Sequence, residues 1–436
     1  MSVFNRESDA DFARGARAVI ALPDTGQASG RDVEARLAEA AGLAEAIGIE
    51  VEDKIHLRIR QPRPATLFGP GQVDRLAEAL VLAEAELLIV DGAISPIQQK
   101  NLEDRTRAKV IDRTGLILEI FGERAATAEG RLQVELAHLD YQAGRLVRSW
   151  THLERQRGGF GFLGGPGETQ IEADRRLIRD RMAKLRRELE QVSRTRSLHR
   201  ARRQRAPWPV IALVGYTNAG KSSLFNRLTR AEVLAEDLLF ATLDPTMREV
   251  ALPGLDKAIL SDTVGFISDL PTQLVAAFRA TLEEVVSADV IVHVRDISHP
   301  DSDAQRGDVE HVLEEIGATP GRGAPMIEAW NKIDLLARDE AERVRAEAER
   351  REDVVRLSAL TGEGVDELLA CIAGHLRKGA PLREITLGAS DGEAMAWLHA
   401  HGEVVGQRQD GLQAHLEVRL SDADWSRFQA RQAERA

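Results

Sequence analysis

The sequence predicts an α/β protein of several domains, with a long antiparallel helical hairpin between two of them. Three observations predict this class. Apolar strands alternate with amphipathic helices over residues 1–125, a heptad pattern runs through residues 126–204, and a second strand–helix series covers residues 205–377. Residues 378–436 follow the sequence "KGAPL" and predict a small domain of the order strand, helix, strand, strand, helix.

Composition places the chain among soluble globular proteins. It has 436 residues, 43% hydrophobic and 29% charged, which is enough to bury a sizeable core. Residues 1–15 lack the basic-then-apolar pattern of a secretory signal, and no apolar run reaches the ~20 residues of a membrane span. Cys371 is the only cysteine, so a disulfide framework and a zinc site are not expected. We therefore expect a cytoplasmic protein without an integral membrane segment, monomeric in solution.

The first domain is expected to hold a parallel sheet, because its strands are separated by helices. Its second helix signal is clear: Ser95 is a candidate N-cap, and Pro96 stands at the first helical position. The predicted elements in order are strand 18–22, helix 32–46, strand 55–60, strand 85–92, a helix from Ser95 and strand 109–113.

The hairpin is predicted from apolar residues spaced alternately four and three apart. At about 1.5 Å per residue its first helix would be roughly 40 Å long. The two heptad runs flank the glycine-rich stretch "RGGFGFLGGPGETQ" (157–170), which therefore lies at the hairpin tip. The runs are Leu132, Leu136, Leu139, Ala143, Leu146, Trp150 and Leu153, then Ile178, Met182, Leu185, Leu189 and Val192.

Charge is unevenly placed along this hairpin. The chain carries a net charge of −12, yet residues 175–205 hold 13 Lys/Arg against three acidic residues, a local charge of +10. This favours contact with a polyanion, although a solvated helix face is the plain alternative. At the tip, Phe160 and Phe162 beside Arg155 and Arg157 could stack on unpaired bases and pair with phosphates; the alternative is an unstructured connector.

The tip is not a nucleotide site, because it lacks GK[ST] and a preceding strand. That pattern occurs instead after the apolar strand "VIALVG", as GxxxxGK[ST] before a helix. Backbone N–H groups would surround the phosphates, Lys221 would reach the β- and γ-phosphates, and Ser222 would bind Mg²⁺. The motif comprises Gly215, Tyr216, Thr217, Asn218, Ala219, Gly220, Lys221 and Ser222.

Two further segments are expected to face the phosphates. In "SDTVGF", Asp262, Thr263, Val264 and Gly265 form DxxG, in which Asp262 would hold Mg²⁺ through water and the Gly265 N–H would touch the γ-phosphate. "FATLDPT" (240–246) stands where the first mobile switch belongs, and Thr242 or Thr246 could complete the Mg²⁺ shell. A plain β-turn at Asp244–Pro245 is the alternative.

The base is predicted to be guanine. In "NKID", the Asp334 carboxylate can accept from N1–H and the amino group of guanine, a pair of donors that adenine lacks. Asn331 would brace the loops, the stem of Lys332 would lie over the base, and Ile333 stands between Lys332 and Asp334 in the sequence. "LSAL", with Ser358, Ala359 and Leu360, can offer a backbone N–H to guanine O6. Four motifs in this order predict a GTP hydrolase in which Lys221 and Gly265 serve catalysis, together with whichever of Thr242 and Thr246 binds Mg²⁺.

One expected residue is missing. Many GTPases have a glutamine after DxxG that orients the attacking water, but here Phe266 stands in that place. We expect slow hydrolysis by the protein alone, with the missing polar group supplied from elsewhere.

These residues together resemble the HflX-type GTPases, over nearly the whole chain. The resemblance rests on "VIDRTGLILEIF", "ATAEGRLQVELAHLDY", "GGPGETQIEADRR", "GYTNAGKS", "FATLDPT" and "DTVGF". It implies a P-loop GTPase fold, Thr242 as the Mg²⁺-binding switch threonine, and nucleotide contacts from Phe240, Ala241, Thr242, Leu243 and Asp244. It also implies binding of GTP and GDP, and of the large ribosomal subunit with the hairpin tip near the peptidyl-transferase region, coupled to splitting of stalled or idle ribosomes under stress. The chain departs from the family at Pro70, where a basic residue is common.

Two other function classes stay open at this stage. One is an rRNA-remodelling enzyme driven by GTP or ATP, and the other is a regulatory switch whose hairpin binds a protein. The basic segment favours RNA, because a protein-binding hairpin should carry an apolar stripe beyond its heptad seam.

Overall fold

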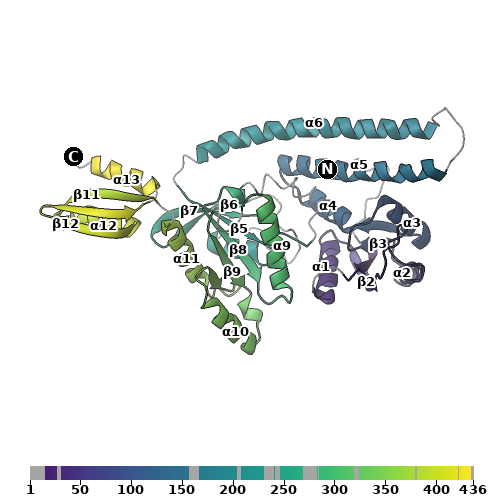
Figure 1. Ribbon diagram of the computed structural model, residues 1–436, viewed down its shortest axis with the longest axis horizontal. Coiled ribbons are helices and arrows are strands. Elements are labelled where there is room, and N and C mark those ends of the chain that lie inside the picture. The colour runs from purple at the N-terminus through teal and green to yellow at the C-terminus, as the bar shows by residue number, and fades with distance from the viewer. Residues whose placement is uncertain are drawn as a thin grey trace. The chain divides into compact units, whose positions relative to one another are not determined.

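The structure is a computed structural model that describes residues 15–26, 31–156, 166–203, 208–229, 240, 246–268, 282, 284–318, 324–378, 381–420 and 422–433 (Figure 1). The chain divides into two compact units. Unit 1 comprises Met1–Arg194, Glu236–Asp244 and Ile267–Arg279, and unit 2 comprises the rest. None of the described helices is both long and apolar enough to cross a membrane.

Unit 1 contains a four-stranded, wholly parallel sheet in the order β2-β1-β3-β4, as the alternating pattern predicts. β3 lies inside the sheet and is buried along its whole length, which explains its uninterrupted apolar sequence LLIV. The strands are β1 (Arg17–Asp24), β2 (Glu50–Arg58), β3 (Leu87–Val90) and β4 (Lys109–Asp112).

Four helices complete this domain: α1 (Val33–Glu45), α2 (Pro70–Leu82), α3 (Pro96–Thr106) and α4 (Arg113–Arg124). α1 packs with α4, and α2 with α3. Ser95 caps α3 as predicted, since its side chain accepts from the Gln98 N–H. α2, which begins at Pro70, was not predicted from the sequence. Pro70, which departs from the family pattern, thus occupies the first position of this helix. A backbone N–H at that position has no partner within the helix, so proline, which lacks one, loses no hydrogen bond there.

The helical hairpin consists of α5 (Ala128–Gln156) and α6 (Pro166–Arg203), of 29 and 38 residues. They run side by side in Figure 1, and Arg181 of α6 pairs with Glu135 of α5. Met182 and Leu185 are buried in α6, as the heptad pattern predicts. Among the side chains of α5 that the structure describes, residues 128–145, the buried hydrophobic ones are Val134 and Ala137, which are not in the predicted seam. α5 also packs against α3 and α4, and so buries a second face that a single heptad pattern does not reveal.

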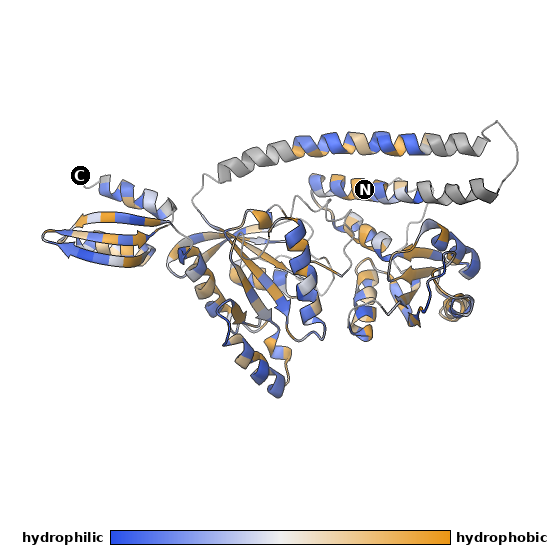
Figure 2. Ribbon diagram, in the orientation of Figure 1, coloured by the Kyte–Doolittle hydropathy of each residue, from blue (hydrophilic) through white to orange (hydrophobic). Residues whose placement is uncertain are grey.

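Unit 2 is built on a six-stranded sheet in the order β10-β9-β8-β5-β7-β6, in which only the β6–β7 pair is antiparallel. Its inner strands are among the most hydrophobic segments (Figure 2). The strands are β5 (Val210–Gly215), β6 (Thr246–Leu252), β7 (Leu255–Asp262), β8 (Val290–Asp296), β9 (Met326–Asn331) and β10 (Val354–Arg356). The described helices of this part include α7 (Lys221–Thr229), α9 (Ser302–Glu315), the 3-10 helix η1 (Ile333–Leu335), α10 (Arg338–Ala348) and α11 (Val365–Lys378).

The C-terminal part of unit 2 is a three-stranded antiparallel sheet, β11-β13-β12, with two helices. Leu398, Leu416, Val418, Leu420 and Phe428 form its core. The element order is the predicted one: β11 (Leu382–Gly388), α12 (Gly392–His401), β12 (Glu403–Asp410), β13 (Gln413–Arg419) and α13 (Asp422–Ala433).

Two short segments from the middle of the chain belong to unit 1. The Phe240 ring packs edge-on against Phe121 of α4, with ring centroids 4.7 Å apart. Ser268 is bound by Arg113 of α4, whose guanidinium reaches both the Ser268 carbonyl (3.2 Å) and its Oγ (2.7 Å). Arg113 also pairs with Asp91 and Glu39. The chain therefore passes from unit 2 into unit 1 directly after Phe266.

Candidate nucleotide site

The predicted site residues follow strands that end at one edge of the parallel sheet. β5 ends at Gly215, β7 at Asp262, and β9 at Asn331, and these strands run in the same direction. Ligands of open α/β sheets bind beyond the carboxyl ends of the strands. The topology thus brings together three motifs that lie far apart in the sequence.

The phosphate loop places Lys221 at the first residue of α7. Its Nζ donates to the Tyr216 carbonyl at 2.8 Å, and the side chain is buried. Burial lowers the pKa of Lys221 to about 8, an effect that the nearby Asp262 carboxylate partly opposes. Gly220 has φ +92°, and a Cβ there would collide with the Asn331 amide, so glycine is required twice over.

The DxxG segment lies against this loop. Asp262 accepts a 2.9 Å hydrogen bond from the Ser222 hydroxyl, and the Phe266 carbonyl accepts from the Thr217 N–H at 2.7 Å. A Cβ placed on Gly265 would lie 3.2 Å from Lys221 Nζ, so the Gly265 backbone and the lysine share one small space. Oxygen donors from Ser222 and Asp262, side by side, suit a hard divalent cation such as Mg²⁺.

Asn331 holds together the loops on the predicted base side of the site. Its Nδ2 donates to the Ala219 carbonyl, and its Oδ1 accepts from the Ala359 N–H, both at 2.8 Å. One buried side chain therefore connects the phosphate loop with the "LSAL" loop. Lys332 Nζ lies 2.8 Å from Asp296, and Asp334 is exposed in η1.

Some predicted residues are not placed beside these. Ala241, Thr242, Leu243 and Asp244 lie outside the described residues, as do Arg157, Phe160 and Phe162 of the hairpin tip. Phe240 is described, and its ring is buried against Phe121, so a nucleotide contact by this residue would involve its main chain. Thr246 is the first residue of β6. The Phe266 side chain is buried, with 1% exposed.

Two residues that fix the loops of the site were not identified from the sequence. Asp296 ends β8 and pairs with Lys332; its place after the apolar run "VIVHV" was an available signal. Arg227 of α7 donates to the carbonyls of Ala359 and Leu360. No local sequence pattern indicates this role, because these partners lie 132 and 133 positions away.

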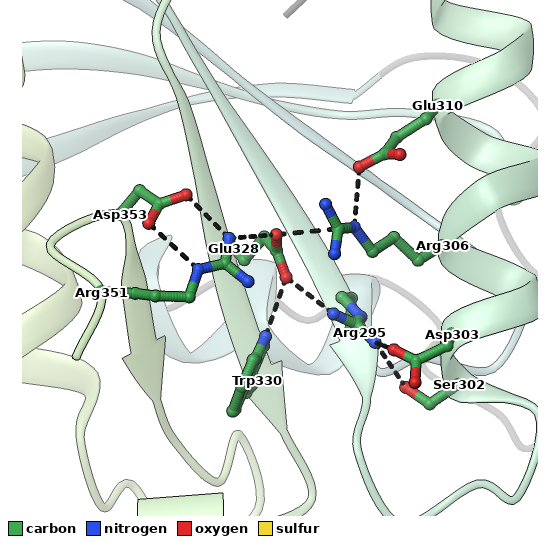
Figure 3. A network of polar contacts seen from close by, with 9 residues as sticks. All are labelled: Arg295, Ser302, Asp303, Arg306, Glu310, Glu328, Trp330, Arg351 and Asp353. Carbon is green, nitrogen blue, oxygen red and sulfur yellow. Dashed lines mark hydrogen bonds and ion pairs between the residues drawn. The ribbon is translucent and has the colours of Figure 1, made fainter. Parts of the chain in front are cut away.

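A buried ion network is centred on Glu328 of β9, the strand that ends at Asn331 (Figure 3). Glu328 of β9 accepts from Arg295 (2.7 Å), Arg351 (2.6 Å) and Trp330 Nε1 (2.9 Å). Burial alone would raise the pKa of Glu328, but the hydrogen bonds from these three donors outweigh it and lower the pKa to about 2. Glu328 is thus ionised at neutral pH and joins β8, β9 and the segment before β10.

Family models and curated relatives show which proteins this chain is similar to. Family models match residues 34–122 (GTP-binding GTPase N-terminal), 124–203 (GTP-binding GTPase middle region), 210–332 (50S ribosome-binding GTPase) and 343–435 (HflX C-terminal domain). A "GTPase HflX" of Magnetococcus marinus is 52% identical over 90% of this chain and 90% of its own. That of Escherichia coli is 42% identical over 90% and 91%. The solved complex of SsGBP with GDP covers 83% of this chain and 99% of its own, at 25% identity and a TM-score of 0.47.

Proposed function

The chain belongs to the HflX family of GTPases, and from this premise we propose that it binds the large ribosomal subunit and couples GTP binding and hydrolysis to the splitting of stalled or idle ribosomes under stress. The observation that carries the proposal is a phosphate-loop GTPase domain of the kind described as 50S ribosome-binding, in one chain with a long basic helical hairpin. Its place of action would be the cytoplasm.

In this proposal different residues bind the phosphates, the cation and the base of the nucleotide. Lys221 neutralises the β- and γ-phosphates, the Gly265 N–H meets the γ-phosphate, and Asp334 reads the base. Ser222 and Thr242 would hold Mg²⁺, with Asp262 holding it through water, and the bound ion would supply positive charge that stabilises the phosphates. Asn331 fixes the distance between the phosphate and base loops, since it is bound to both.

The hairpin would supply the contact with RNA. Between residues 175 and 192, α6 has seven basic residues and three acidic ones, and it is mostly hydrophilic in Figure 2. Arg176, Arg179, Arg186 and Arg187 are all exposed. These exposed arginines would attract a polyanion such as RNA, and the attraction would weaken as the salt concentration rises.

Sedimentation with ribosomal particles tests the proposal. We expect the protein to pellet with large subunits in the presence of a non-hydrolysable GTP analogue, to pellet less with GDP, and to convert intact ribosomes into subunits. Binding to large subunits without splitting would favour rRNA remodelling. No binding to subunits in either nucleotide state would overturn the proposal.

A further inference from the structure

Arg227 lies in the last turn of α7, the helix whose first residue is Lys221 of the phosphate loop. Its guanidinium does not pair with a carboxylate in any described contact. Instead Nε donates to the Ala359 carbonyl at 2.6 Å, and Nη2 donates to the Leu360 carbonyl. A single planar group thus holds two consecutive peptides of the "LSAL" loop, a geometry that the fork of donors on arginine allows.

The loop is shaped to receive this side chain. Gly362 has φ +94°, and a Cβ there would lie 2.7 Å from Arg227 Nη1. Glycine at this position therefore satisfies both a left-handed turn and the approach of the guanidinium. The Ser358 N–H bonds to the Glu363 carbonyl and the Gly362 N–H to the Ser358 carbonyl, which closes the loop on itself.

These contacts determine the direction in which the Leu360 N–H of the loop points. The Ala359 N–H donates to Asn331, and the Thr361 N–H donates to Ser358 Oγ. The Leu360 N–H belongs to the same peptide as the Ala359 carbonyl that Arg227 holds. No described peptide bond is cis, and in a trans peptide the N–H and C=O point in opposite directions, so the Leu360 N–H is directed away from the guanidinium.

We propose that Arg227 is a positioning residue for guanine recognition: it orients the Ala359–Leu360 peptide so that the Leu360 N–H meets O6 of the base. Arg227 touches no part of the nucleotide and acts through this peptide. The inference rests on the proposal that the "LSAL" loop faces the base, but it does not depend on ribosome binding. It also gives α7 a role at both ends, with the phosphates at Lys221 and the base loop at Arg227.

The test compares three nucleoside diphosphates bound to the full-length protein, by titration calorimetry. In 6-thio-GDP a poor acceptor, sulfur, replaces O6, whereas IDP keeps O6 and lacks only the 2-amino group that Asp334 is proposed to read. We expect the wild-type protein to favour GDP over both analogues. In Arg227→Lys and Arg227→Gln, the preference for GDP over 6-thio-GDP should fall about fivefold, as for a hydrogen bond lost or misdirected, while the preference over IDP should stay unchanged.

Arg377→Lys is the matched control. Arg377 also lies in the last turn of a helix, α11, and donates to a backbone carbonyl, that of Pro253 at 3.0 Å. Its substitution should leave both preferences unchanged. Equal losses of both preferences in the Arg227 variants would mean general loosening of the site and would overturn the inference, as would an unchanged preference over 6-thio-GDP. Wild-type protein that does not distinguish GDP from 6-thio-GDP would show instead that the loop does not read O6.

Discussion

At the scale of single residues, Asp334 carries the proposed choice of base. It lies in η1, the short helix that begins directly after the left-handed residue Lys332 (φ 65°), and its carboxylate is exposed. Asp334→Asn exchanges one acceptor oxygen for a donor, so binding of GDP should weaken about 100-fold, while xanthosine diphosphate should bind relatively better. Titration calorimetry measures both affinities. Asp339→Asn, a nearby exposed aspartate in the first turn of α10, is the control, and an unaltered GDP affinity for Asp334→Asn would remove this residue from the base site.

Phe266 stands where a water-orienting glutamine is common, and its burial leads to a second expectation. The Phe266 N–H donates to the Gly215 carbonyl at 3.1 Å, while its ring is in the core. Phe266→Gln should therefore place an amide among apolar side chains, lower the free energy of unfolding by about 3–5 kcal/mol, and leave turnover by the free protein well below ~1 s⁻¹. Phe266→Leu, which keeps an apolar side chain, should destabilise less. Faster GTP hydrolysis by Phe266→Gln would mean that this side chain reaches the γ-phosphate.

The sequence predicted those site residues whose motif spacing is local. Gly215 to Ser222 form one strand–turn–helix unit, so eight consecutive residues carry the whole geometry of the loop. Arg227 and Asp296 were missed for the opposite reason: each acts on a loop that is distant along the chain, and only the folded sheet edge brings them together. The ring of Phe240 also shows a limit, because a motif tells which residues are near the nucleotide but not which way a side chain turns.

At the scale of elements, the Glu328 network joins β8 to β9, and it supports a prediction about pH. The folded-state pKa of Glu328, about 2, lies below its usual value of 4.5. Its contribution to stability is therefore fully present above pH 4.5 and is lost as the pH falls toward 2. Glu328→Gln removes the buried carboxylate that pairs with Arg295 and leaves this arginine only the exposed Asp303, so it should cost about 3–5 kcal/mol at pH 7. Denaturant unfolding should show the difference from wild type shrinking as the pH is lowered from 5 to 3.

Glu349→Gln is the matched control for this network. Glu349 forms an ion pair with Arg345 at 2.9 Å, but both side chains are more than half exposed. Such pairs contribute about 0–1 kcal/mol, so the control should change little at any pH. A constant difference between Glu328→Gln and wild type from pH 7 to pH 3 would contradict the role given to ionised Glu328.

The parallel strands of unit 1 and the element order of the C-terminal part were predicted, because each has a regular apolar pattern. α5 was predicted as a helix, but its buried residues were not. It packs against α3 and α4 and also pairs with α6 through Glu135 and Arg181, and its buried Val134 and Ala137 fall outside the heptad run. α2 was missed because its start, Gly69–Pro70, resembles a turn; the same glycine and proline are also good helix-start residues.

At the scale of the whole molecule, the chain itself links the phosphate site to the hairpin. Gly265 and Phe266 adjoin the phosphate loop, and the next residues, Ile267 and Ser268, belong to unit 1. There Ser268 is held by Arg113 of α4, and α4 packs against α5, the first helix of the hairpin. A change at the γ-phosphate thus has a short covalent and hydrogen-bonded route to the hairpin. Such a route becomes a mechanism only where a measurement shows that the two ends are coupled.

Shortening the hairpin tip measures that coupling. The segment 157–165 joins helices of 29 and 38 residues, lacks GK[ST], and on our proposal probes RNA with its aromatic and arginine side chains. Replacing residues 158–165 with a short Ser/Gly turn should leave the GTP affinity of the free protein intact, because every described nucleotide-site residue lies beyond residue 208. It should sharply reduce hydrolysis stimulated by large subunits, and ribosome splitting with it, since stacking is worth about 1–3 kcal/mol per base.

A shortened protein that still splits ribosomes at the normal rate would make the tip a mere connector. One that loses GTP binding would show that the glycine-rich tip, and not only the loop at 215–222, serves the nucleotide.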